Sequence, residues 1–550
     1  MSDINYLRQA KQSIAKGDLS NAKIAIKSEL LQHPNNYEAM ILDCDIARVE
    51  KNITEQKSKL KRLIKQKPEM LQFSVELAKI YIDTKQYEKA PKVFEPLFKL
   101  FNHPDLFFNH AWFLTRAAEY QKAICQYEKA IELNVSFKEE VYLNIANILS
   151  TWLNQPEKAR DYLNKALTIN PRYIDAIYNL ANLEEDLGHR SKAIALFKKV
   201  IDLNPLHGSA SARLALASDD ENCGDLIYNL EELIKNSKLN RIASCECFYA
   251  LGKLHDQNQS YAKAFQYWEK ANQLNKSQQK QFDGKEFENQ VTEIISKYDS
   301  EYIKKHSLKT KTQPIFIAGM FRSGSTLLEQ MLSSHDRVNA GGELDYFVRH
   351  FEAFEMEGLT HTEEIRYRLT KIQRAYDEIL KRHGSPELLV TDKRPDNIFH
   401  LGLILTIYPS AKILVTKRNL LDNCLSIYSN RFSEKQNYAC DIGDIKTYAA
   451  QTNKILMHWK NIFKNNIHIV NYDELVADPK AQLTEALKFL NLEWQESCLK
   501  FHKLKNLVQT ASVWQIRKPL YKNSSGRWIN YKNELSKYFR EIKADTSYTT

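Results

Sequence analysis

The chain has 550 residues, more than one hydrophobic core normally fills, so two or three domains are expected. Its 43% hydrophobic and 27% charged residues are typical of an ordinary soluble protein, and no apolar run approaches the roughly 20 residues that span a bilayer. The net charge of +10 is spread unevenly, with ten Lys or Arg against three Asp or Glu in residues 501–550.

The first residues, Met1-Ser-Asp-Ile-Asn-Tyr, lack the apolar core of a signal peptide, so a cytoplasmic location is the default expectation. The eight cysteines form no C-x-x-C pair and no metal-ligand spacing, which predicts reduced, mostly buried thiols. The basic C-terminal stretch shows no nucleic-acid module. A multiply charged anionic cofactor is therefore a simpler target for it than nucleic acid.

Residues 1–280 recur with a period near 34. Pro34 and Pro68 keep this spacing, and so do Pro171 and Pro205. Small residues follow the same rhythm at Ala22, Ala90, Ala123, Ala159, Ala193 and Ala264. The pattern resembles the tetratricopeptide repeat, two helices whose small residues allow close packing. One such pair cannot bury its apolar face alone, so an all-α solenoid is predicted.

A solenoid offers a concave groove that commonly takes extended peptides, so we expect a protein or peptide partner there. A spacer or a dimerisation arm is an equally open interpretation, which leaves a homodimer possible. Residues 281–312, rich in Lys and Gln, are predicted to form a helical linker.

After residue 313 the pattern changes to an α/β one. Apolar, β-rich runs at 314–319, 387–391, 411–416 and 467–471 alternate with helical stretches. This order is typical of a central parallel sheet with helices on both faces, predicted here over residues 313–550. Ligands of such sheets bind beyond the carboxyl ends of the strands.

The first run opens into the turn Gly319-Met-Phe-Arg322-Ser323-Gly324-Ser325-Thr326, followed by a helical pattern. A strand feeding a small-residue turn and a helix N-terminus aims several backbone N–H groups at one spot, where a phosphate fits. The spacing nearly matches the nucleotide P-loop, but Ser325 stands where that loop has its lysine. Arg322 supplies the cation instead.

With Gly341-Gly342-Glu343 downstream, the segment resembles the nucleotide loop of sulfotransferases that use 3′-phosphoadenosine 5′-phosphosulfate (PAPS). It is most similar to the protein-tyrosine sulfotransferases and to bacterial proteins that join tetratricopeptide repeats to such a domain. The matching residues are Arg322, Ser323, Gly324, Ser325, Thr326, Leu327, His335, Gly342 and Glu343. Phe321 replaces the usual proline.

The resemblance implies a role for each matching residue. Arg322, Ser323, Gly324, Ser325 and Thr326 would bind the cofactor. Arg418, with Ser426 eight residues later, would hold its 3′-phosphate, and Tyr472 matches a tyrosine of the same site. Lys393 and Ser512 would assist the sulfuryl group, and Glu343 would be the general base. Residues 510–528 resemble a flap whose cations Arg517, Lys518 and Arg527 contact phosphate.

We therefore predict a PAPS-dependent sulfotransferase that needs no metal, because Arg322 and Lys393 supply the positive field. The favoured acceptor is a protein tyrosine, and adenosine 3′,5′-bisphosphate would be the other product. A glycan or small-molecule acceptor stays open. Alternatives from other classes are an inactive repeat scaffold and a P-loop NTPase or kinase, in which Asp392 would bind magnesium.

Overall fold

The computed structural model describes residues 5–218, 223–356, 358–384, 387–504, 517, 520 and 524–539. Its backbone contacts divide the chain into two compact units, residues 1–176 and 177–550. The division falls inside the repeats rather than behind them. This division does not test the predicted boundaries near residues 280 and 312, which remain a proposal.

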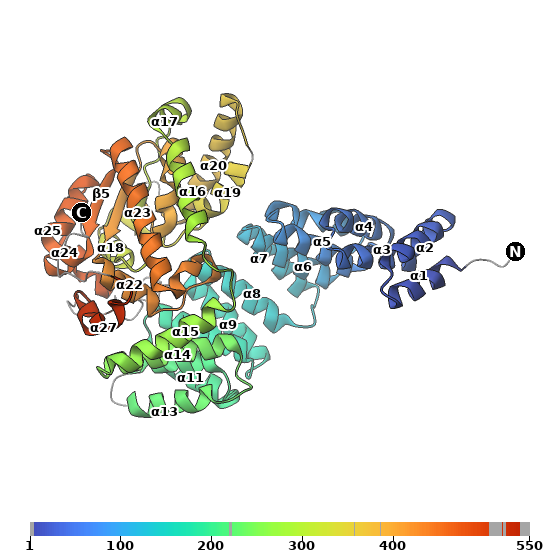
Figure 1. Cartoon of the computed structure of the whole chain (residues 1–550), viewed down its shortest axis with the longest axis horizontal. Helices are drawn as coiled ribbons and strands as arrows, with labels where there is room; N and C mark the ends of the chain where they lie inside the picture. The colour runs from blue at the N-terminus through green and yellow to red at the C-terminus, as the bar shows by residue number, and fades with distance from the viewer. Residues whose placement is uncertain are drawn as a thin grey trace. The chain divides into compact units, whose positions relative to one another are not determined.

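The first unit is built from helical pairs, as predicted (Figure 1). Its helices are α1 (Tyr6–Ala15), α2 (Leu19–Gln32), α3 (Tyr37–Val49), α4 (Ile53–Gln66), α5 (Leu71–Asp83), α6 (Pro104–Arg116), α7 (Tyr120–Glu132), α8 (Lys138–Thr151) and α9 (Pro156–Ile169). Three short 3₁₀ helices, η1 (Tyr87–Lys89), η2 (Pro91–Val93) and η3 (Glu95–Lys99), stand where α5 would have its partner. Pro91 and Pro96 explain this, because proline cannot donate the hydrogen bond that continues an α-helix.

Small side chains pack between the paired helices along the repeat array. The six alanines that mark the predicted period have no exposed surface: Ala22, Ala90, Ala123, Ala159, Ala193 and Ala264. Their burial confirms the reason given for the repeat, namely that a small residue lets two helices approach closely.

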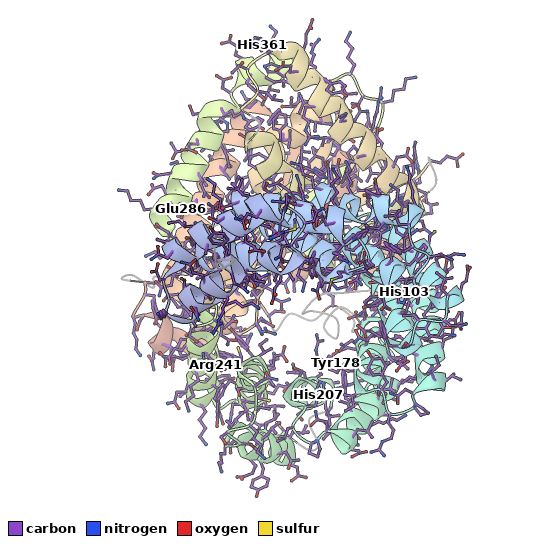
Figure 2. The ribbon with its side chains drawn as sticks, turned by 90° about the vertical axis from the view of Figure 1, so that its right-hand side faces the viewer. His103, Tyr178, His207, Arg241, Glu286 and His361 are labelled. Carbon is purple, nitrogen blue, oxygen red and sulfur yellow. The ribbon has the colours of Figure 1, made fainter. Side chains whose placement is uncertain are left out.

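The second unit begins with the later repeats, α10 (Ile174–Asp186), α11 (Arg190–Leu203), α12 (Gly208–Ala217), α13 (Cys223–Ile234), α14 (Arg241–Gln257) and α15 (Tyr261–Lys276). Figure 2 shows Tyr178 of α10 beside His207, which precedes α12; their ring centroids are 4.8 Å apart. This tilted ring contact joins one repeat to the next.

The segment predicted as a linker packs into the α/β domain. It forms α16 (Gly284–Lys297) and α17 (Ser300–His306). Phe287 stacks on Tyr448 at 5.0 Å, and Tyr298 is fully buried against Gly402, where a Cβ would lie 2.5 Å from its ring. The segment thus forms two helices that pack on the core of the α/β domain.

The α/β domain has a five-stranded, all-parallel sheet in the order β2-β3-β1-β4-β5. Its strands are β1 (Ile315–Gly319), β2 (Val338–Ala340), β3 (Leu389–Asp392), β4 (Lys412–Lys417) and β5 (Ile467–Asn471). Four of them are the predicted apolar runs. The sequence analysis missed β2, because this strand has three residues and only Val338 is buried.

Helices cover both faces of the sheet. They are α18 (Ser325–Leu332), α19 (Tyr346–Met356), α20 (Thr362–Arg382), α21 (Leu401–Ile407), α22 (Leu420–Tyr428), α23 (Ile442–Ile462), α24 (Tyr472–Ala477), α25 (Pro479–Phe489) and α27 (Lys532–Leu535). The 3₁₀ turns are η5 (Pro395–His400), η6 (Glu434–Cys440), η7 (Glu496–Lys503) and η8 (Arg527–Tyr531). None of the helices in the described ranges is long and apolar enough to cross a bilayer.

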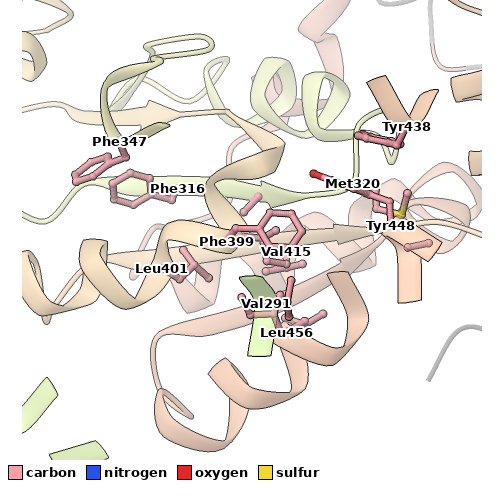
Figure 3. Packing of buried hydrophobic residues seen from close by; sticks show 14 of the residues in the cluster. Val291, Phe316, Met320, Phe347, Phe399, Leu401, Val415, Tyr438, Tyr448 and Leu456 are labelled. Atoms are coloured by element: carbon pink, nitrogen blue, oxygen red, sulfur yellow. The ribbon is translucent and has the colours of Figure 1, made fainter. Parts of the chain in front are cut away.

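Alternation along the strands divides the hydrophobic core in two. Ile315 and Ile317 of β1 face a core shared with α18 and α25, whereas Phe316 and Ala318 face the opposite one. Figure 3 shows the second core, with Phe347 against Phe316 and Val291 of α16 near Leu456 of α23. With both faces covered, the carboxyl ends of the strands are the natural place for a ligand.

Candidate functional site

The carboxyl ends of the five strands gather most of the residues that the sequence singled out. Arg322 follows β1, Glu343 follows β2, Lys393 follows β3, Arg418 follows β4 and Tyr472 follows β5. Because the strands are parallel and adjacent, all five positions share one edge of the sheet.

The turn after β1 has a shape that requires glycine at two positions. A Cβ on Gly319 (φ +136°) would lie 2.5 Å from the Thr416 carbonyl oxygen. A Cβ on Gly324 (φ +100°) would lie 2.3 Å from the Tyr472 ring. The Ser323 hydroxyl bonds to the Thr416 hydroxyl at 2.6 Å and donates to the Met320 carbonyl at 2.6 Å. Ser323 is thus occupied in shaping the turn.

Helix α18 begins directly after this turn. No described side chain caps this helix, and Gly324 occupies the cap position. The first N–H groups, carried by Ser325 and Thr326 among others, therefore remain available for an anion at the positive end of the helix dipole.

Phe321, which stands where the similar sequences have proline, is fixed by its neighbours. Its ring makes an edge contact with Phe432 at 5.7 Å. Its carbonyl oxygen accepts a hydrogen bond of 2.9 Å from the Asn423 side chain. Packing and this hydrogen bond hold the turn without the fixed φ of a proline.

Four of the predicted cofactor residues contact one another. Arg322 Nε donates to Ser426 Oγ at 3.2 Å, and Arg418 Nη1 donates to the Arg322 carbonyl at 3.2 Å. The Arg418 guanidinium lies 4.8 Å above the centre of the Tyr472 ring. In the described part of the chain, Arg418 Nε is buried without a hydrogen-bond partner. A buried, unsatisfied donor of this kind fits a phosphate oxygen.

Glu343 and Lys393 form an ion pair at the other end of the site. Lys393 Nζ lies 2.6 Å from Glu343 Oε1, and Lys393 N donates to the Gly342 carbonyl at 2.8 Å. The Lys393 side chain is buried, whereas 36% of the Glu343 side chain is exposed. The buried ammonium needs this carboxylate, and the exposed carboxylate can still meet an incoming group.

Glu329 of α18 supports this pair, and the sequence analysis missed it. Its buried Oε1 accepts hydrogen bonds from Gly342 N at 3.1 Å and from the Thr391 hydroxyl at 2.8 Å. Burial raises the pKa of Glu329, and nearby Lys393 opposes the shift. A glutamate inside an amphipathic helix gives no sequence signal of its own; only its burial reveals it.

Asp392 turns away from the site. Tyr376 of α20 donates to Asp392 Oδ2 at 2.8 Å, and complete burial raises the pKa of Asp392 to about 8. A carboxyl group that holds its proton at neutral pH is a poor magnesium ligand. This placement weighs against the NTPase interpretation.

The predicted flap lies partly outside the described residues, which include neither Ser512 nor Lys518. Arg517 donates to the carbonyls of Leu504 and Asp186, and Arg527 Nη2 lies 2.8 Å from Asp256 Oδ2. Both arginines thus contact repeat residues. Their contact with a cofactor remains a prediction.

Two aspartates that the sequence analysis did not single out hold residues 524–528 against the domain. Asp422 accepts hydrogen bonds from the backbone N–H groups of Gly526 at 2.6 Å and Trp528 at 2.8 Å. Burial raises the pKa of Asp422, while these two N–H groups oppose the shift. Asp473 binds Ser525 Oγ and Asn419 N. The hydrogen bonds of these two aspartates hold residues 524–528 beside Arg418, which donates to the Ser524 carbonyl.

Comparison with known proteins agrees with this architecture. Residues 314–496 match the sulfotransferase family, and residues 153–217 match the tetratricopeptide repeat. An uncharacterised Aquifex aeolicus protein is 29% identical over 403 residues, 70% of this chain and 52% of that protein. The Drosophila melanogaster protein-tyrosine sulfotransferase is 25% identical over 266 residues, 44% of this chain and 52% of that enzyme.

Among solved structures, the sulfotransferase domain of a Synechococcus olefin synthase has a TM-score of 0.32 and 18% identity, covering 43% of this chain and 99% of that domain. The chain spans about half the length of the first curated relatives that it matches.

Proposed function

Because a sulfotransferase domain stands behind tetratricopeptide repeats in this chain, we propose that it transfers a sulfuryl group from PAPS to an acceptor hydroxyl. The observation that carries the proposal is the Glu343–Lys393 pair of 2.6 Å at the same sheet edge as the arginine-bearing turn. A base beside a buried cation, next to a phosphate-sized hole, suits transfer of an anionic group.

The residues present fit PAPS by their chemistry. The N-terminus of α18 and Arg322 suit the 5′-phosphosulfate, which calls for several N–H donors and a cation. Arg418 and Ser426 suit the 3′-phosphate, because the planar guanidinium fork matches a terminal phosphate better than a lysine does. Tyr472 holds the Arg418 guanidinium by its ring face.

When bound, PAPS would supply the sulfuryl group: the acceptor oxygen would form the new O–S bond, and the 5′-phosphate oxygen would leave with the electron pair of the S–O bond that breaks. Glu343 takes the proton of the acceptor hydroxyl. Once protonated, Glu343 holds Lys393 less strongly, so the ammonium can stabilise the negative charge that develops during transfer. Ser512, which matches the family serine, would assist there.

A tyrosine in a protein is the acceptor we favour, with the repeats recruiting the protein. The first unit carries a groove of about 600 Å³ between α5, α6 and the start of α8. Apolar side chains of Leu71, Val75, Phe108 and Phe137 line it, together with charged groups such as Lys79 and Asp105. This mixture suits an extended peptide. A glycan or small-molecule acceptor is the second candidate.

Two measurements test the proposal. Adenosine 3′,5′-bisphosphate alone should raise the melting temperature, whereas ATP with magnesium should raise it less. Incubation with radiolabelled PAPS and a tyrosine peptide should then label the peptide, and the matched phenylalanine peptide should stay unlabelled. Stabilisation by magnesium ATP but not by the bisphosphate would overturn the proposal in favour of an NTPase.

A further inference from the structure

Helix α14, the first helix of the last repeat, carries charged side chains into the neighbourhood of the site. Lys253 Nζ lies 3.6 Å from Asp256 Oδ2. The same oxygen lies 2.8 Å from Arg527 Nη2, and Tyr531 donates to Asp256 Oδ1 at 2.6 Å. One carboxylate thus serves two cations and a hydroxyl, with α14 on one side and η8 on the other.

The packing beneath these residues fixes α14 in place. Next to Lys253, Gly252 touches Trp268 of α15 so closely that a Cβ would lie 2.3 Å from the indole ring. Trp268 is fully buried in the core that also contains Tyr531. Asn272 of α15 donates to the Tyr428 carbonyl at the end of α22 at 2.8 Å. The hairpin of α14 and α15 (Figure 1) therefore packs directly against the α/β domain within the second unit.

Among the described residues, two arginines and one carboxylate act electrostatically on Lys253. They are Arg527 from η8, Arg322 from the turn after β1, and Asp256 from its own helix. Burial first, and then the two arginines, lower the pKa of Lys253 to about 8, while Asp256 opposes them. Lys253 and Arg527 share the Asp256 carboxylate, and Arg322 acts on Lys253 from the turn after β1. An incoming anion would complete this arrangement.

We propose that Lys253 binds a phosphate group of the nucleotide beside Arg322, so that the last repeat supplies part of the cofactor site. The inference rests on the proposed function and extends it: the repeats would complete the nucleotide site as well as recruit the acceptor. Asp256 holds Lys253 and Arg527 together until the nucleotide phosphate joins them.

The test is titration of the full chain with adenosine 3′,5′-bisphosphate by calorimetry. Lys253→Ala should weaken binding roughly tenfold to a hundredfold, the range for a lost charge-assisted contact. Lys263→Ala, a change at an exposed lysine of α15, should bind like the wild type. Melting temperatures without nucleotide identify any variant that fails to fold.

The pH dependence separates a binding role from a structural one. Wild-type affinity should fall severalfold between pH 7 and pH 9, because Lys253 loses its charge there. Lys253→Arg should remove that part of the decline, since a guanidinium stays charged throughout. The ratio of the two affinities at each pH isolates this residue from other titrating groups.

The outcomes distinguish this inference from the proposed function. A folded Lys253→Ala variant that binds the bisphosphate like the wild type overturns the inference and leaves the proposed function standing. The same holds if the variant raises only the KM for an acidic peptide, because Lys253 would then serve the acceptor. A wild-type chain that does not bind the bisphosphate overturns both.

Discussion

The two ends of the candidate site are built differently. The phosphate turn is local: residues 319–325 form one strand end, one turn and one helix start. The Glu343–Lys393 pair is assembled from distant segments, with Glu329 of α18 bonded to the backbone of Gly342 and to Thr391. The turn is encoded in consecutive residues, although side chains of other segments pack against it, whereas the pair itself is assembled from separate segments and depends on each of them.

The largest effect is expected at the assembled end. Glu343→Gln removes the proposed base but keeps its size, so sulfuryl transfer should slow on the order of 10²–10⁴-fold, with bisphosphate binding unchanged. Single-turnover rates and the thermal shift measure the two quantities. Glu378→Gln, which alters an exposed glutamate paired with Lys381, is the matched control. Near-normal turnover would remove Glu343 from the mechanism.

Substitutions of Glu329 test how much the Glu343–Lys393 pair depends on the hydrogen bonds that Glu329 makes beside it. Glu329→Ala removes the acceptor of the Gly342 N–H and the nearer acceptor of the Thr391 hydroxyl. At about 1–3 kcal/mol for a lost buried hydrogen bond, we expect transfer to slow roughly tenfold to a hundredfold. Glu329→Gln keeps an oxygen at that position and should retain most of the rate. If both variants lose equal activity, the charge of Glu329 matters and its hydrogen bonds do not.

Beside the phosphate turn, Arg418→Ala should weaken bisphosphate binding roughly tenfold to a hundredfold, because a charge-assisted contact to phosphate is lost. The maximal rate at saturating PAPS should change less than the affinity does. Calorimetry measures the affinity, with Arg382→Ala, at an exposed site on α20, as the control. Unchanged affinity would refute the phosphate role of Arg418.

The same contrast explains what the sequence could predict. The turn, the four apolar strands and the repeat period are patterns in neighbouring residues, and the structure has each of them. Glu329, Asp422, Asp473 and Lys253 were missed because each acts across a long stretch of chain. An acidic or basic residue in a helix is usually solvated, so only tertiary contacts distinguish these four. The strand β2 was missed for another reason: it is too short to show a period.

Asp392, which precedes Lys393 at the end of β3, should make the folding stability depend on pH. Its pKa of about 8 in the folded chain lies above the ordinary value of 3.8, so the folded state binds the proton more tightly than the unfolded state. Its contribution to folding stability is present below pH 4 and declines by about 1.4 kcal/mol per pH unit as pH rises toward 8. Chemical denaturation from pH 5 to pH 8 should show this decline.

Asp392→Asn should flatten that decline, because an amide does not titrate. Asp161→Asn, at an exposed aspartate of α9, should keep the wild-type slope. Parallel slopes for wild type and Asp392→Asn would mean that Asp392 is ionised in the folded chain. The objection to a magnesium site at this residue would then fall.

The smallest effect is expected at Tyr472, which lies between the phosphate turn and residues 524–528. Tyr472 donates to Ser524 Oγ at 3.1 Å while its ring supports Arg418 and packs on Gly324. Tyr472→Phe removes the hydroxyl but keeps the ring, so bisphosphate affinity should fall only a fewfold, the equivalent of about 0.5–1.5 kcal/mol. Tyr367→Phe, at an exposed tyrosine of α20, is the control. A loss as large as that of Arg418→Ala would mean that the hydroxyl itself binds the nucleotide, and that the local end too depends on a distant segment.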